Sequence, residues 1–99
     1  MTTSADTLRY QLPEIMDLAA APALRTYLLE NRGAPLELDA SAVQRVGGLC
    51  LQVLLSARST WAADGQVLSF VEPSSTLKDA FLTIGAEEIA AEIPEDPSL

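Results

Sequence analysis

The segment from Leu36 to Arg58, LELDASAVQRVGGLCLQVLLSAR, constrains the fold of this chain more tightly than any other. We interpret it as a buried strand over Leu36–Asp39, a short polar connection, a turn of small residues at Gly47-Gly48 and an apolar helix. A strand that enters a helix through a glycine turn leaves the first backbone N–H groups of that helix at the surface. Such a helix end suits either a phosphate or a docked protein, and the surrounding residues favour docking.

The rest of the chain alternates strand and helix patterns. Besides the segment above, we expect a strand over Thr7–Leu12, a helix over roughly residues 19–31, a strand over Gln66–Val71, a helix that begins after Ser74 or Ser75 and ends at Gly85, and one more short helix within residues 86–93. The helix after Gly47-Gly48 is expected to run from about Gly48 to Ala63.

This order, strand–helix–strand–helix–strand–helix, predicts a single α/β domain over residues 1–99, with a small mixed or parallel sheet covered by helices. We expect Leu36–Asp39 and Gln66–Val71 to be parallel neighbours, joined by a right-handed crossover through the second helix. The two ends, residues 1–6 and 94–99, are expected to be flexible.

The charge balance disfavours several classes of function. The formal net charge is -8, with six scattered basic residues and no histidine, so we expect no nucleic-acid partner and no attraction to an anionic membrane surface. We also expect no metal site and no cofactor, because the commonest metal ligand is absent. No apolar run is long enough to insert into a membrane, and the first ten residues lack the features of a secretory signal.

The sequence offers little catalytic chemistry, and we expect no enzyme. A single cysteine, Cys50, is consistent with a reducing, cytoplasmic setting. We interpret it as a small core residue and not as a nucleophile. Asp39 is expected to order the loop after its strand. We expect Glu37 on the opposite face of the sheet, so that the two carboxylates do not form an acid–base pair.

The second helix carries an unusual surface stripe. One line of its residues is small and uncharged, consisting of Gly48, Gln52, Ser56, Ser59 and Ala63, and Leu49 and Val53 flank this line. A solvated helix face normally carries lysine and glutamate. The stripe therefore predicts a surface that another protein approaches closely, the alternative being that helices cover both faces of the sheet and leave the stripe less exposed.

The chain resembles STAS domains from Thr7 to about Ile93. The resemblance rests on Leu38-Asp39-Ala40-Ser41, on the spacing to Val46-Gly47-Gly48, on the Gln52–Leu55 helix and on Leu82–Gly85. That family includes anti-sigma-factor antagonists, cytoplasmic domains of sulphate transporters, and a small subunit of a bacterial lipid-transport ABC complex.

In the antagonists, a serine or threonine heads the second helix after an aspartate, and its phosphorylation by a partner kinase releases the partner. The resemblance places Gly47 at the aspartate and Gly48 at the phosphoacceptor, and Leu49 and Cys50 replace a small residue and a glycine. It thus implies that the usual phosphoryl switch is absent. Ser41 is a candidate substitute phosphoacceptor, although a serine after Asp-Ala more often hydrogen-bonds the backbone in a turn.

The resemblance implies a non-enzymatic interaction module in bacterial signal transduction, of the partner-switching or chemotaxis-associated kind. Its expected partner is a serine kinase of the anti-sigma-factor type or a chemotaxis-type regulator. The alternative is an accessory subunit of an ABC transport complex that binds the ATPase. In either setting the expected contact patch consists of Ser41, Arg45, Gly47, Gly48, Leu49, Gln52 and Val53.

Overall fold

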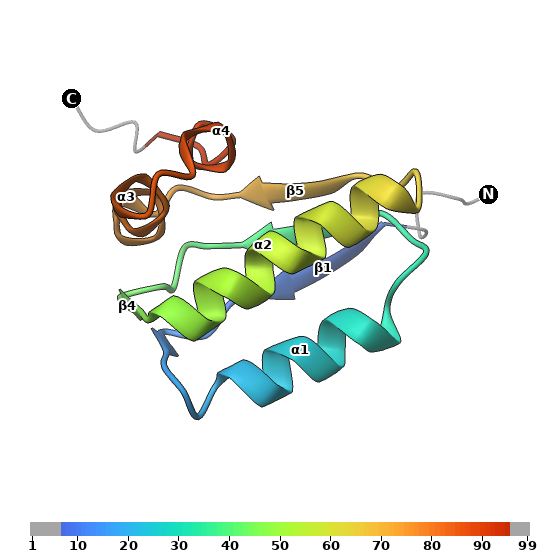
Figure 1. Cartoon of the computed structure of the whole chain (residues 1–99), viewed down its shortest axis with the longest axis horizontal. Coiled ribbons are helices and arrows are strands. Elements are labelled where there is room, and N and C mark those ends of the chain that lie inside the picture. The colour runs from blue at the N-terminus through green and yellow to red at the C-terminus, as the bar shows by residue number, and fades with distance from the viewer. Residues whose placement is uncertain (1–6, 96–99) are drawn as a thin grey trace.

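A computed structural model describes residues 7–95, which form five strands and four helices (Figure 1). The elements are β1 (Leu8–Gln11), β2 (Ile15–Met16), α1 (Ala21–Glu30), β3 (Leu36–Asp39), β4 (Arg45–Val46), α2 (Gly48–Ala63), β5 (Leu68–Val71), α3 (Ser75–Thr83) and α4 (Glu87–Ala90). The predicted helix from Gly48 to Ala63 is confirmed at both ends. Of the ends expected to be flexible, residues 1–6 and 96–99 lie outside the described residues.

The larger sheet has the strand order β1-β3-β5, and both of its pairings are parallel. Leu36 stands opposite Leu8 on one side and Leu68 on the other, which confirms the predicted pairing of the two central segments. Every pairing among residues 7–95 is parallel, so the sheet is not mixed there.

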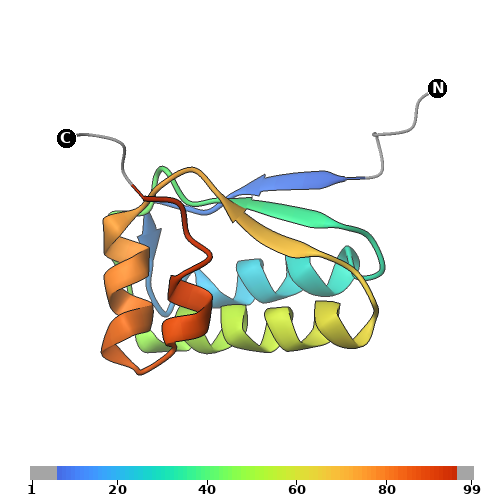
Figure 2. The same cartoon turned by 90° about the horizontal axis from the view of Figure 1, so that it is seen from above.

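The strand order explains why the crossover helices lie on one face of this sheet. The chain steps in the same direction from β1 to β3 and from β3 to β5, with α1 and α2 as the connections. Right-handed crossovers in the same direction place both helices on the same side. Figure 2 shows α1 and α2 side by side beneath the sheet, while α3 and α4 pack at the end toward which the strands point. In the part of the chain that the structure describes, the alternative of helices on both faces is therefore wrong.

The core lies between this sheet and α1 and α2. Leu36 and Leu38 of β3 are buried against buried side chains of the helices, including Leu54 and Trp61. Complete burial of such a side chain contributes about 1.5–3 kcal/mol. The indole N–H of Trp61 donates to the carbonyl oxygen of Ala34 at 2.7 Å, so this large side chain is buried without an unpaired donor.

The other face of the sheet is polar. Arg9 of β1 lies 3.8 Å from Glu37, 3.2 Å from Asp39 and 3.3 Å from Glu72, so its guanidinium links all three strands or their ends. The expectation that Glu37 and Asp39 lie on opposite faces is wrong, because residues two positions apart in a strand share a face. Parallel sheets are usually covered on both sides, and here the alternation in LELD supplies a polar face on the side that no helix of residues 7–95 covers.

A second, two-stranded sheet was not predicted. β2 and β4 contribute only two residues each and pair in parallel, Ile15 with Arg45 and Met16 with Val46. Two residues carry no detectable alternation, so the sequence offers no signal for such a pairing. The pairing continues to the start of α2, where the Gly47 N–H donates to the carbonyl oxygen of Met16 at 2.8 Å.

Candidate docking surface

The first turn of α2 has free space around its first side-chain position. Gly47 precedes the helix in an extended conformation, and no side chain of residues 7–95 caps the first turn. A Cβ atom added at Gly48 would meet no heavy atom of the described residues within 4 Å, and the backbone there is not in the left-handed region. Packing therefore does not require glycine at this position, and a serine would fit.

The exposed and buried faces of α2 follow the predicted pattern. Gly48, Gln52 and Ser56 are exposed, while Leu51 and Leu54 are buried. Leu49 is 48% exposed and Val53 is half-buried, as expected for residues that flank the stripe. An exposed leucine beside small uncharged residues gives a surface that another protein covers at little desolvation cost.

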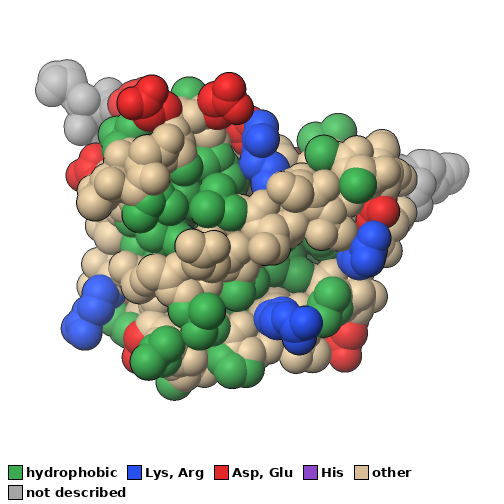
Figure 3. All heavy atoms as spheres, viewed as in Figure 1, with side chains coloured by type: hydrophobic (Ala, Val, Ile, Leu, Met, Phe, Trp, Pro, Cys, Tyr) green, Lys and Arg blue, Asp and Glu red, His purple; other side chains and the backbone are tan. Residues whose placement is uncertain are grey.

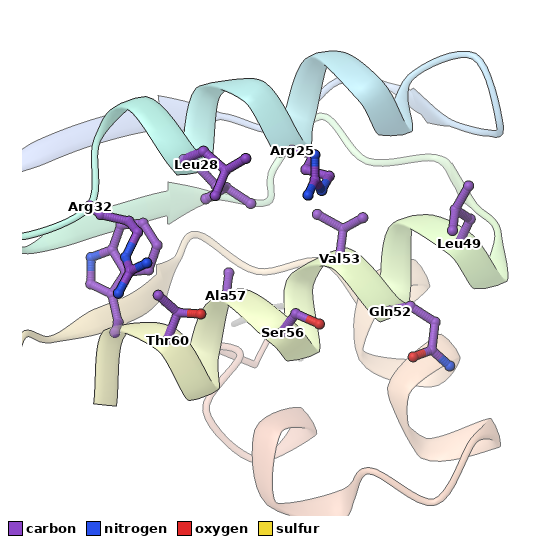
Figure 4. A pocket seen from close by; sticks show the side chains of 11 residues that line it. Arg25, Leu28, Arg32, Leu49, Gln52, Val53, Ser56, Ala57 and Thr60 are labelled. Atoms are coloured by element: carbon purple, nitrogen blue, oxygen red, sulfur yellow. The ribbon is translucent and has the colours of Figure 1, made fainter. Parts of the chain in front are cut away.

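A groove of about 390 Å³ separates α1 from this face of α2 (Figure 4). We call it the α1–α2 groove. It is lined by Arg25, Leu28, Leu29, Arg32, Leu49, Gln52, Val53, Ser56, Ala57, Thr60 and Trp61. In Figure 4, Arg25 reaches from α1 toward Val53 of α2.

The contribution of α1 to this surface was missed by the sequence analysis. Arg25 and Leu29 are four positions apart in α1, a spacing that places residues on one side of a helix, and Arg32 follows in the turn after the helix ends. That spacing is a usable signal, but the pattern alone does not say which element the stripe faces. Figure 3 shows hydrophobic side chains between α1 and α2, and acidic side chains around the edge of the same face.

Two cations near this surface have no acidic partner within residues 7–95. Arg25 of α1 and Arg45 of β4 form no salt bridge there, whereas the other four basic residues each form at least one. Arg32 donates from Nε and Nη2 to Asp64 at 3.1 and 3.0 Å. This hydrogen-bonded pair raises the pKa of Arg32 and lowers the pKa of Asp64.

Ser41 does not join the groove. Its backbone N–H and its hydroxyl both donate to Oδ1 of Asp39, at 2.9 and 2.7 Å. These two hydrogen bonds, assisted by Arg9, lower the pKa of Asp39. The Asp39 carboxylate lies on the uncovered face of the sheet, opposite α1 and α2. Ser41 thus lies in a turn as expected, but its hydroxyl binds the Asp39 side chain and not the backbone, and its role as a contact residue or phosphoacceptor stays a prediction.

The structure gathers most of the predicted patch at one end of α2. Gly47, Gly48, Leu49, Gln52 and Val53 lie on or just before the first two turns of the helix. Arg45 is exposed on β4, two residues before Gly47.

Cys50 is fully buried, as predicted for a core residue. Its Sγ lies 3.4 Å from the carbonyl oxygen of Asp17, to which the thiol donates a weak hydrogen bond. Burial raises the pKa of the Cys50 thiol, with a smaller contribution from the charge of Asp17. A raised pKa and lack of access both oppose nucleophilic chemistry at this sulfur.

The fold is typical of a STAS-like α/β domain. Its strands are parallel, its crossover helices lie on one face, and a glycine turn precedes α2. A family model described as "Mlab, STAS domain" matches residues 2–93, and the chain therefore belongs to the STAS domain family. No curated protein matches the chain. STAS domains are generally non-catalytic and commonly mediate protein interactions in signalling or transport. Within residues 7–95, no helix combines the length and the apolar character needed to cross a membrane.

Proposed function

We propose that this chain is a non-enzymatic docking module that binds a partner protein through the exposed face of α2, without phosphoryl control at the head of that helix. The observation that carries the proposal is the first turn of α2. It contains no hydroxyl, yet it leads into an uncharged face of α2 that exposes Leu49 and Gln52. A phosphate at this point would add about -1.5 to -2 charges to an apolar contact. With Gly48 in place, the surface stays competent for binding at all times.

The first setting for this activity is bacterial signal transduction in the cytoplasm. The partner would be a serine kinase of the anti-sigma-factor type or a chemotaxis-type regulator, as the antagonist-like fold suggests. The net charge of -8 supports this setting, because a strongly charged module stays soluble while it is free of its partner.

The second setting is transport, in which the chain is an accessory subunit docked on an ABC ATPase. The missing hydroxyl at Gly48 favours this candidate, because a subunit that remains assembled has no need of a release switch. The same face of α2 would contact the ATPase.

The test begins with affinity capture of the tagged chain from its source cell and identification of the bound proteins by mass spectrometry. A kinase, receptor or response regulator supports signalling, and an ATPase recovered with its permease supports transport. The variant Gln52→Glu then introduces a charge on the exposed face of α2. Burial of an unpaired charge is expected to weaken binding of the captured partner at least about tenfold.

A matched control is Gln11→Glu, which makes the same chemical change at an exposed position of β1. It is expected to bind as the wild type does. Val53→Asp is a less clean variant, because Val53 packs partly against the core and its replacement also costs stability. If Gln52→Glu and Gln11→Glu bind the partner equally well, α2 is not the docking face.

A further inference from the structure

We propose that the α1–α2 groove receives an amphipathic helix of the partner, and that this helix carries acidic side chains toward α1. The inference rests on the proposed function and names the chemistry of the segment that docks. It also makes α1 half of the binding site.

The shape of the groove suits a short helix. Its apolar lining comes from both helices and includes Leu28 of α1 with Val53 and Trp61 of α2. The α2 side runs from Leu49 to Trp61, a rise of about 18 Å, which is the length of roughly three helical turns. An apolar groove between two helices is a common receptor for an amphipathic helix.

The charged residues of the groove favour a partner segment with acidic side chains. Its lining contains two charged residues, Arg25 and Arg32, and both are cationic in a chain of net charge -8. Arg25 has no acidic partner among residues 7–95. Arg32 is oriented by Asp64 through Nε and Nη2, which leaves its Nη1 donors available. Complementary charge at the rim of an apolar contact sets partner choice and orientation.

The spacing of the arginines defines the acidic pattern expected of the partner. They are seven positions apart, with Arg25 inside α1 and Arg32 in the turn two residues after its last residue, a separation of about 10 Å if the helical rise is continued. A helix lying along the groove would present carboxylates at i and i+7, with apolar residues at i+3 and i+4 facing Leu28 and Val53. An anionic membrane surface is a poorer fit, because two arginines among acidic neighbours do not make a basic face.

The probe is a synthetic peptide of about 14 residues, held helical by a staple, with glutamates seven positions apart and leucines between them. The control peptide has the same sequence with lysine in place of both glutamates. In a ¹⁵N NMR titration of the whole chain, we expect the acidic peptide to shift the amides of Arg25, Leu29 and Val53. The lysine peptide should bind at least about tenfold more weakly.

Two protein variants with the same net charge complete the test. Arg25→Gln is expected to weaken binding of the acidic peptide about two- to fivefold, the usual effect of losing one exposed ion pair. Thr26→Glu makes the same change in net charge at an exposed neighbouring residue outside the groove lining, and it should not weaken binding.

The inference fails if the two peptides bind equally well, if neither shifts the groove amides at millimolar concentration, or if Arg25→Gln and Thr26→Glu have equal effects. It also fails if phosphatidylglycerol vesicles produce the groove shifts and the acidic peptide does not. The proposed function is tested separately by Gln52→Glu. If that variant releases the captured partner while the acidic peptide does not bind, docking through α2 stands and the acidic helix is wrong.

Discussion

A carboxylate in the first turn of α2 is expected to raise the free energy of unfolding and to lower the affinity for the partner. In Gly48→Asp the new side chain enters open space, because a Cβ there meets no atom within 4 Å and the backbone is not left-handed. No side chain in the described part of the chain caps the first backbone N–H groups of α2. A negative charge beside them interacts favourably with the helix dipole, by about 0.3–1 kcal/mol. Replacing glycine in a first turn adds a few tenths of a kcal/mol.

The expected gain in the free energy of unfolding is therefore about 0.5–1 kcal/mol for Gly48→Asp. For a domain of this size, such a gain raises the melting temperature by about 2–8 °C. The neutral isostere Gly48→Asn supplies the control, because it fills the same space without charge. The difference between the two variants should shrink in concentrated salt, which screens the exposed charge.

The assay pairs thermal unfolding at low and high salt with binding of the captured partner. Gly48→Asp should melt above Gly48→Asn at low salt, yet bind the partner more weakly, because its carboxylate is carried into an apolar contact. If Gly48→Asp melts below Gly48→Asn, the head of α2 is not an open, electropositive helix end. If it binds the partner as tightly as the wild type, the helix head lies outside the interface.

Three further outcomes test the structure. Ser41→Ala keeps the backbone N–H bond to Asp39 but removes the hydroxyl bond, so it should raise the pKa of Asp39 in a carboxyl NMR titration. Because that pKa is lowered in the folded chain, the stabilisation is present above the unfolded pKa and is lost as the pH falls through the folded pKa. An unchanged pKa would contradict the contribution of the Ser41 hydroxyl. Cys50 should react with a thiol reagent only after unfolding, and rapid labelling of the native chain would contradict its burial. Trp61→Phe should lower the free energy of unfolding by about 1–3 kcal/mol in urea, since the carbonyl of Ala34 loses its donor; an unchanged midpoint would refute that bond's contribution.

Much of the fold was predictable from local sequence patterns. Alternation over Leu36–Asp39 separates a buried from a polar face, and Gly47-Gly48 marks the turn at which α2 begins. Ser74 caps α3, where its hydroxyl accepts the N–H of Leu77, and Gly85 follows the end of that helix with a left-handed backbone. Each of these features depends on residues within a turn or two of one another, which is why they can be read without tertiary structure.

Part of the candidate site was predictable for the same reason. The helical period alone separates exposed Gln52 from buried Leu51 and Leu54, and it identifies an uncharged stripe on α2. The misplacement of Glu37 relative to Asp39 was an error of interpretation, because the two-residue period of a strand already puts them on one face. By contrast, the pairing of β2 with β4 carried no signal, since two residues establish no period.

The sequence by itself determined where α2 begins, which of its faces is apolar and that its first turn lacks a hydroxyl. Only the tertiary structure decided that Arg25 of α1 lies across a groove from Val53, and that Ser41 turns toward the opposite face of the sheet. The physical reason is that near neighbours along the chain encode local periodicity. Which surfaces meet depends instead on the direction and handedness of the two crossovers, which place α1 and α2 together on one side of the sheet.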